Sequence, residues 1–104
     1  MSYRSRFKRK DIDELFRAVL TLDSEEECYR FFEDVCTVNE LHSIAQRFQV
    51  ASMLNDKKTY NEIEADTKAS TATISRVNKC LEYGADGYKL VLERLHEQKD
   101  PETK

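Results

Sequence analysis

Residues 59–79 read TYNEIEADTKASTATISRVNK, the most informative stretch of the chain. Thr59 stands three residues before Glu62, the spacing of a capping box, in which two side chains satisfy free backbone N–H groups at the start of a helix. The pattern predicts a short helix from there, a tight turn at residues 68–70 and a second helix over residues 71–83. Two short helices joined by a three-residue turn are typical of a helix-turn-helix.

A helix-turn-helix also needs apolar or small side chains where its two helices meet. Counted from Tyr60, these are the fourth, eighth, tenth, fifteenth and eighteenth places, which hold Ile63, Thr67, Ala69, Ile74 and Val77. Four of the five fit well, and the threonine is tolerable. Lys68 occupies a turn position where glycine is often favoured, and Glu64 one where a small residue is common. We therefore predict a helix-turn-helix over about 59–83 with these five side chains buried.

The outward face of the second helix is suited to duplex DNA. It carries small hydroxyl, methyl and basic groups, namely Thr71, Ala72, Thr73, Ser75, Arg76 and Lys79. The start of a recognition helix lies closest to base edges, so we expect its first three residues to contact thymine methyls and base acceptors. Lys79, farther along, is expected to contact phosphate. The alternative is a solvated Thr/Ser-rich helix in a small bundle.

Apolar side chains recur at helical spacing through the rest of the chain. They predict helices over residues 10–21 and 38–54, one between Ser24 and Cys36, and a last helix after Asp86. The fold class is thus all-α with about six helices, because two glycines and one proline in 104 residues leave few of the turns that a many-stranded sheet needs. The apolar faces of the first three predicted helices are broad for so short a chain, and this favours self-association.

The net charge of −3 is unevenly distributed. Residues 1–10 carry five basic groups and no acid, residues 11–40 carry ten acids against two arginines, and residues 41–104 carry ten of each. We expect a basic N-terminal arm at 1–10, one helical DNA-binding domain at 11–97 and a flexible tail at 98–104. The arm either lies along phosphates or is a solubilising tail.

Other classes of protein find little support in the sequence. There is no Gly-rich phosphate loop and no nucleophile motif, and His42 and His96 lack metal-ligand spacing, so we expect no enzyme, cofactor or metal site. No apolar run approaches the roughly 18 residues that span a bilayer, so we expect a cytoplasmic protein without a membrane partner. The alternative to DNA binding is a helical protein-interaction module without DNA affinity, which Glu62, Glu64 and Asp66 favour.

Two separated segments resemble a known family. Residues 72–76 read ATISR and resemble the recognition-helix region of the Trp repressor, and Thr37 with Glu40, followed by Arg47, resembles the start of that family's central helix. Over its whole length the chain is similar to the Trp-repressor-related YerC/YecD family. The resemblance implies a transcriptional regulator, expected to be a repressor, that forms an intertwined homodimer. It also implies DNA contacts by Asn61, Thr71, Ala72, Thr73 and Ser75.

The resemblance extends to an effector pocket. The two arginines and the threonine that hold tryptophan in the Trp repressor match Arg47, Arg76 and Thr37. The glycine that follows the second arginine in that repressor is here Val77, whose branched side chain would occupy space beside the ligand ring. We therefore expect that free tryptophan is not the effector. The alternative role for Val77 is to fill the cavity as a core residue.

Overall fold

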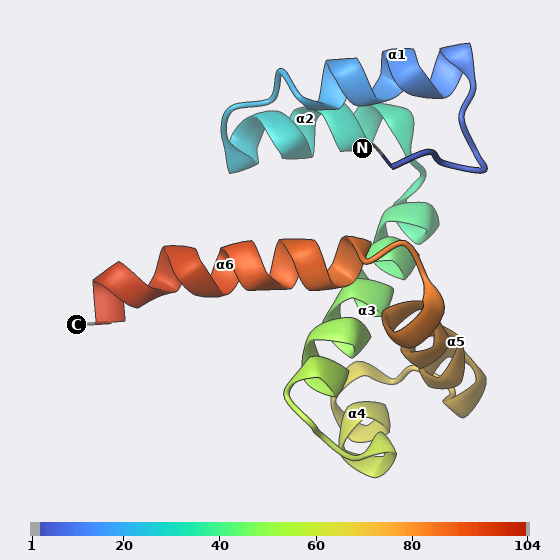
Figure 1. Cartoon of the computed structure of the whole chain (residues 1–104), viewed down its shortest axis with the longest axis vertical. Helices are drawn as coiled ribbons and strands as arrows, with labels where there is room; N and C mark the ends of the chain where they lie inside the picture. The colour runs from blue at the N-terminus through green and yellow to red at the C-terminus, as the bar shows by residue number, and fades with distance from the viewer. Residues whose placement is uncertain (1–2, 104) are drawn as a thin grey trace. The chain divides into compact units, whose positions relative to one another are not determined.

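The computed structural model describes residues 3–103, with side chains described for residues 3–98. This part of the chain contains six helices and no strand (Figure 1), so the all-α prediction is confirmed. The helices are α1 (Lys10–Val19), α2 (Glu25–Val35), α3 (Val38–Asn55), α4 (Tyr60–Thr67), α5 (Thr71–Tyr83) and α6 (Gly87–Thr103). Helix α6 continues through most of the segment assigned to a tail, whose side chains from residue 99 lie outside the described residues. The domain boundaries stay a prediction.

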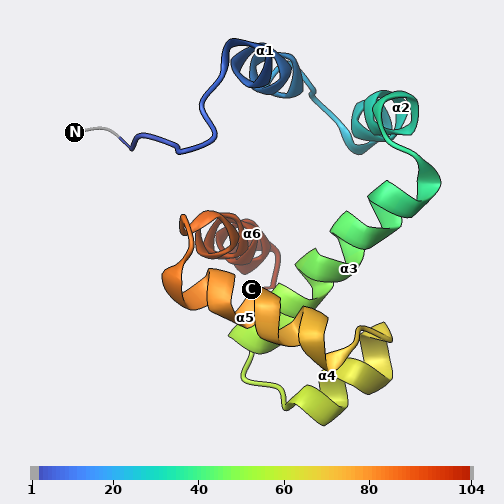
Figure 2. The same cartoon turned by 90° about the vertical axis from the view of Figure 1, so that its right-hand side faces the viewer.

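The chain divides into two compact units, Met1–Val38 and Asn39–Lys104. The second unit contains the core, in which α4 and α5 pack against the C-terminal half of α3 (Figure 2). Its buried apolar side chains come from these three helices and from the turn between α4 and α5: Val50, Ala51, Ile63, Ala69, Ile74, Val77 and Leu81. All five positions predicted to be buried are at most 8% exposed. The predicted packing of the helix-turn-helix is thus confirmed.

The ends of α4 follow directly from the side chains placed there. Thr59 Oγ1 accepts a hydrogen bond from the Glu62 backbone N–H at 3.1 Å, and Glu62 Oε1 accepts one from the Thr59 N–H at 2.8 Å, which is the predicted capping box. At the other end Lys68 adopts a left-handed conformation with φ 63°. This conformation explains why glycine is often favoured at that place, since a Cβ makes it costly.

Thr67 can be buried because its hydroxyl both donates and accepts a hydrogen bond. Its Oγ1 donates to the Ile63 carbonyl at 2.8 Å and accepts from the Ala69 N–H at 3.1 Å. Gln46 on α3 donates from Nε2 to the Thr67 carbonyl at 3.0 Å. These bonds satisfy the polar groups of the turn, which would otherwise destabilise the core, and they attach the turn to α3.

Helix α5 ends at a glycine for a steric reason. Gly84 donates its N–H to the Cys80 carbonyl at 2.9 Å, and a Cβ at Gly84 would lie only 2.4 Å from that oxygen. Any residue with a Cβ therefore does not fit at position 84 unless the backbone moves. The glycine is therefore favoured by this close approach to the Cys80 carbonyl and not by a left-handed backbone, since its φ is −87°.

In the described part of the first unit, residues 3–38, no residue is buried, either on α1 or on α2. Large apolar side chains remain exposed on both helices, among them Phe16 at 58%, Leu20 at 82% and Tyr29 at 62%. Ser24 caps α2 by accepting a bond from the Glu27 N–H, but Glu27 accepts from the Asp23 N–H instead of that of Ser24, so only half of a capping box forms. The predicted broad apolar stripes are thus open to solvent in a single chain.

Candidate DNA-binding surface

The six residues predicted to contact DNA lie on α4 and α5. Asn61, Thr71, Ala72, Ser75 and Lys79 are exposed, and Thr73 is half-buried. Exposed and buried residues alternate along α5 because of its helical geometry. Ile74, Val77 and Leu81 lie on one side of the helix and face the core. The opposite side of α5 presents small polar groups, and the packing of its buried side chains against the core holds the helix in position.

The start of α5 is capped by a residue that the sequence analysis assigned only to the turn. Ser70 Oγ accepts a hydrogen bond from the Thr73 N–H at 3.1 Å and lies 3.1 Å from Thr73 Oγ1. The first turn of α5 holds no acid, so nothing in it neutralises the positive end of the helix dipole. Such an end suits an anion like phosphate. The sequence signal for this cap is the serine that directly precedes Thr71, the first residue of α5.

The three acids of α4, which disfavour DNA, have different surroundings. Glu62 is engaged in the capping box, where the N–H of Thr59 lowers the pKa of its carboxyl below the ordinary value. Glu64 Oε2 accepts a hydrogen bond from Thr71 Oγ1 at 3.3 Å. Asp66 is exposed. One of the three carboxylates thus stabilises a helix end, and another contacts a predicted DNA-reading residue.

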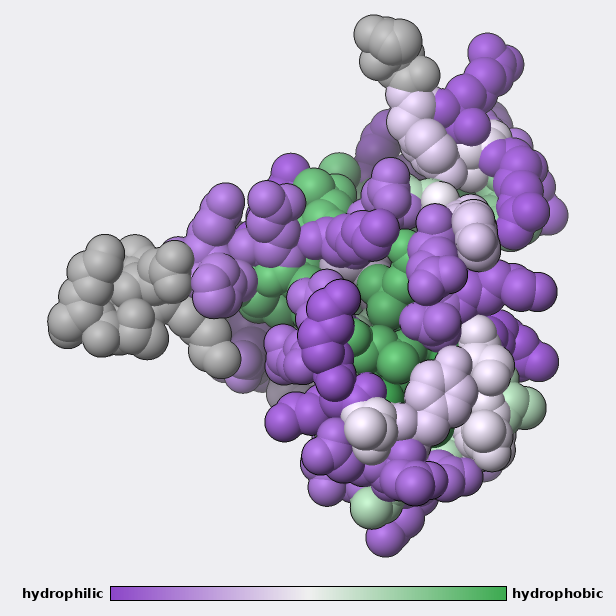
Figure 3. Space-filling model, turned by 60° about the horizontal axis from the view of Figure 1, so that its bottom comes forward, coloured by the Kyte–Doolittle hydropathy of each residue, from purple (hydrophilic) through white to green (hydrophobic). Residues whose placement is uncertain are grey.

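Positive charge surrounds this surface. Five basic residues of α4, α5 and the turns beside them are exposed: Lys57, Lys58, Lys68, Arg76 and Lys79. No ion pair involves any of the five within the described residues. The end of the second unit that carries α4 is covered largely by hydrophilic residues (Figure 3). The surface is therefore polar, with exposed cations on α5 and the adjoining turns, of which Lys58 lies near enough to Glu62 to help lower its pKa.

The candidate effector residues are divided between the units. Thr37 belongs to the first unit, and Arg47 and Arg76 belong to the second. Arg47 is half-buried on α3 and donates from Nη1 to Ser43 Oγ at 2.8 Å, whereas Arg76 is exposed on α5. Val77 is only 2% exposed and belongs to the same core cluster as Val50 and Ala51. Its side chain fills space between α5 and α3.

A groove between α3 and α6 was missed by the sequence analysis. It has a volume of 670 Å³ and is lined by polar and apolar residues of the two helices: Phe48, Ser52, Asn55, Asp56, Lys89, Leu92, Glu93, Leu95 and His96. The ring of Phe48 lies 6.5 Å from that of Tyr88, centroid to centroid. Neither a sequence motif nor a charge cluster marks this groove, because it arises from the angle between two helices.

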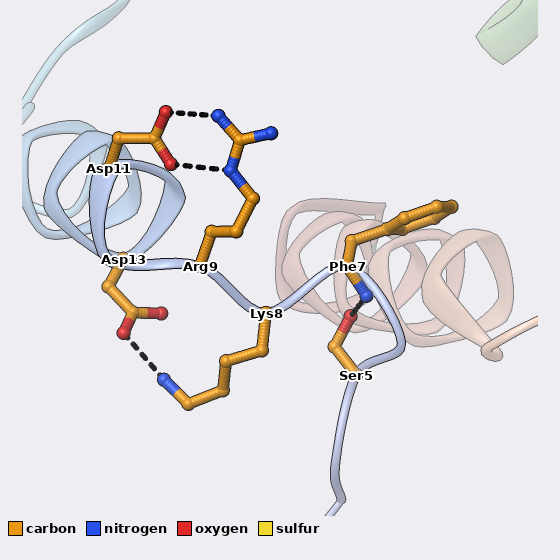
Figure 4. Close-up of polar contacts among 6 residues, drawn as sticks. All are labelled: Ser5, Phe7, Lys8, Arg9, Asp11 and Asp13. Carbon is orange, nitrogen blue, oxygen red and sulfur yellow. Dashed lines mark hydrogen bonds and ion pairs between the residues drawn. The ribbon is translucent and has the colours of Figure 1, made fainter.

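The basic N-terminal arm is described from Tyr3 onward and contacts the start of α1 (Figure 4). Arg9 forms two hydrogen bonds with the Asp11 carboxylate, at 3.0 and 2.6 Å, and these bonds lower the pKa of Asp11. Lys8 Nζ lies 2.5 Å from Asp13 Oδ2. Two of the five basic groups of the arm are thus paired with acids of the same unit.

The described residues contain no group of three or more His, Cys, Asp or Glu side chains that could hold a metal ion. None of their helices is both long enough and apolar enough to cross a membrane.

Known proteins resemble the chain over most of its length. The family model of the Trp repressor protein matches residues 10–96. YerC of Bacillus subtilis, an uncharacterized protein, is 53% identical over 92 residues, which cover 88% of each chain. The crystal structure of a TrpR-like protein from Eubacterium eligens has a TM-score of 0.85 and 54% identity, covering 88% of this chain and 94% of that one. The crystal structure of a candidate Trp repressor from Staphylococcus aureus has a TM-score of 0.84 and 50% identity, covering 88% and 91%.

Proposed function

The chain belongs to the Trp repressor protein family, and from that membership we propose that it is a sequence-specific DNA-binding transcriptional regulator that acts as a repressor in the cytoplasm. The observation that carries the proposal is the start of α5. Its first turn carries hydroxyl groups and no acid of its own, although Glu64 of α4 contacts Thr71, and its outer side is exposed while Ile63, Ile74 and Val77 pack behind it. A rigid helix with small polar side chains at its tip suits the major groove.

In this proposal, base contacts come from Asn61 on α4 and from Thr71, Ala72, Thr73 and Ser75 on α5, and a phosphate contact comes from Lys79. The hydroxyl groups bond base edges, and the methyl groups pack on thymine. The exposed lysines and Arg76 supply the sequence-independent part of the affinity. No catalytic group, cofactor or metal is part of the proposal.

We further propose that the regulator is a homodimer in which α1 and α2 are covered by a second copy. The absence of any buried residue in α1 and α2 supports this arrangement, since helices with such apolar faces are not stable in water by themselves. Two copies related by a two-fold axis carry two reading surfaces, so the DNA site should be nearly palindromic.

A role as an interaction module without DNA affinity is the competing proposal. Glu64 and Asp66 favour it, because exposed carboxylates beside the reading helix repel phosphate. The cations beside α5 outnumber these acids and lack ion-pair partners within the described residues. Charge alone therefore favours DNA only moderately, and a binding experiment has to decide.

The deciding experiment is selection of bound fragments from a random duplex library at low and at physiological salt. We expect an enriched, nearly palindromic motif with half-sites about 10 bp apart or a multiple of it. Thr73→Ala should relax the preference at particular base pairs, with losses on the order of 1 to 3 kcal/mol, whereas Lys79→Ala should weaken all sequences alike. No enriched motif, together with no binding to random duplex at low salt, would establish the interaction module.

A further inference from the structure

We propose that Glu64 determines part of the base preference by fixing how the hydroxyl of Thr71 makes hydrogen bonds. The inference rests on the proposed function, since it requires α5 to enter a major groove. Thr71 is the first residue of α5 and lies exposed at the end that approaches base edges. Glu64 is exposed on α4, and its carboxylate reaches across the turn to Thr71.

The contact has a defined direction. A threonine hydroxyl carries one hydrogen and two lone pairs, so an isolated Thr71 either donates to a base or accepts from one. Thr71 Oγ1 lies 3.3 Å from Glu64 Oε2, and a carboxylate has no hydrogen to donate. The hydrogen between them therefore belongs to Thr71. With that hydrogen committed to Glu64, Thr71 Oγ1 presents only lone pairs to the groove.

Neighbouring polar groups leave this pair intact. Ser70 Oγ is engaged with the N–H and the hydroxyl of Thr73, and Lys68 Nζ donates to the Ala65 carbonyl at 3.3 Å. In the described part of the chain, no lysine or arginine forms an ion pair with Glu64. The carboxylate of Glu64 is therefore not engaged by a cation and stays available to the hydroxyl of Thr71.

The direction of this bond selects a kind of base. In the major groove, hydrogen-bond donors are presented only by the N4 amino group of cytosine and the N6 amino group of adenine. Guanine N7 and O6 and thymine O4 are acceptors, so they meet the lone pairs of Thr71 and the carboxylate of Glu64 unfavourably. The base that faces Thr71 should thus be cytosine or adenine in each half-site.

The test is the random-duplex selection with four full-length chains: the wild type, Glu64→Ala, Glu64→Gln and Asp66→Asn. In Glu64→Ala the hydroxyl of Thr71 regains both roles, so the preference for cytosine or adenine at one position per half-site should fall about tenfold. Glu64→Gln offers Thr71 both an amide oxygen that accepts and an amide N–H that donates, so the preference should fall by less than in Glu64→Ala. Asp66→Asn removes a charge from the same helix without touching Thr71.

Glu64 is expected to have two effects, one on the affinity for every DNA sequence and one on the preference for cytosine or adenine, and the variants separate them. Asp66→Asn, Glu64→Gln and Glu64→Ala should all raise the affinity for every sequence, because each removes one negative charge near phosphate. Glu64→Ala should also change the motif most, and Asp66→Asn should leave it unchanged. Thermal melting of all four chains checks that the fold is retained, as expected for exposed residues.

A double-mutant cycle shows whether Glu64 acts through Thr71. Thr71→Val should relax the same position, and adding Glu64→Ala to it should change the motif no further. A further change would mean that Glu64 reads the base itself, which overturns the inference. An unchanged motif in Glu64→Ala, with DNA still bound, overturns it too and leaves the proposed function standing. A wild-type chain that binds no duplex overturns both.

Discussion

At the scale of single residues, two side chains occupy places where a glycine would be the simpler choice. Lys68 adopts a left-handed backbone conformation in the turn, and Val77 fills core space where the related repressor has a glycine. Both positions could be found from the sequence, because each departs from a known pattern. The sequence left open what each departure means, since strain and packing depend on neighbours distant in the chain.

Replacing Lys68 by glycine should stabilise the protein. Glycine adopts φ 63° without the steric penalty of a Cβ, which outweighs its larger loss of chain entropy, so we expect a gain of about 0.5 to 1 kcal/mol and a melting temperature a few degrees higher. The control is Lys58→Gly in the preceding turn, where φ is not positive. It should destabilise the protein slightly. A Lys68→Gly chain that melts no higher than the wild type would contradict the strain argument.

Val77 should prevent binding of free tryptophan. Overfilling a packed site costs about 1 to 3 kcal/mol, which corresponds to a roughly ten- to hundredfold weaker ligand. Calorimetric titration of the wild type should therefore show no saturable micromolar binding, and DNA binding should not depend on added tryptophan. Val77→Gly should create or strengthen binding while lowering the free energy of unfolding by about 2 kcal/mol or more.

A matched control tests whether tryptophan binding by Val77→Gly comes from the space opened beside the ligand or only from a loosened core. Val50→Ala removes volume from the same buried cluster, on α3 instead of α5. It should destabilise the protein without creating a tryptophan site. Saturable binding to the wild type, or a DNA shift seen only with tryptophan, would refute the prediction.

At the scale of elements, the helices and the core of the helix-turn-helix could be predicted because they depend on local rules. Capping residues at Thr59 and Ser24, apolar spacing and Gly84 determine the helix ends within a few residues. The bond from Gln46 to the Thr67 carbonyl and the groove between α3 and α6 could not be predicted. They depend on the angle at which separated helices meet, which no local pattern encodes.

The capping box of α4 gives a prediction about stability and pH. Thr59→Ala should cost about 1 kcal/mol of unfolding free energy, measured by urea denaturation. The pKa of Glu62 is lowered in the folded chain, so its contribution is present above the ordinary value of 4.5 and is lost as the pH falls through the lowered pKa.

Glu62→Gln should therefore destabilise the protein at neutral pH and change it little in strong acid. Glu97→Gln, at an exposed position inside α6 and away from either end of that helix, is the matched control and should have little effect at either pH. An equal effect of Glu62→Gln at both pH values would show that its charge does not matter for the cap.

At the scale of the whole molecule, the two units of the chain differ in what holds them together. The second has a closed core, whereas α1 and α2 have none. The width of the apolar stripes in the sequence predicted that these helices would need a partner, and self-association stays a prediction. The sequence could not say which faces meet, because the pairing of two copies depends on the shape of the assembled surface.

Phe16→Ser distinguishes a dimer from a monomer. In a single chain Phe16 is 58% exposed, so a monomer should tolerate serine there. In the proposed dimer the ring is buried, and its loss should weaken association by roughly 1.5 to 3 kcal/mol, or about ten- to hundredfold. Sedimentation equilibrium at micromolar concentration measures both. The neighbouring Glu14→Ser should leave association unchanged, and a folded wild-type monomer would exclude the interlocked arrangement.

If a second copy covers α1 and α2 as proposed, their lack of any buried side chain in a single chain also links the abundance of this protein to its lifetime. A chain that completes its fold only on meeting another copy gains stability by mass action, so its melting temperature should rise with concentration. At low expression, single chains would keep α1 and α2 loose and open to proteases. The cell would then remove scarce regulator faster than plentiful regulator, which sharpens the response of its target genes to the rate of synthesis.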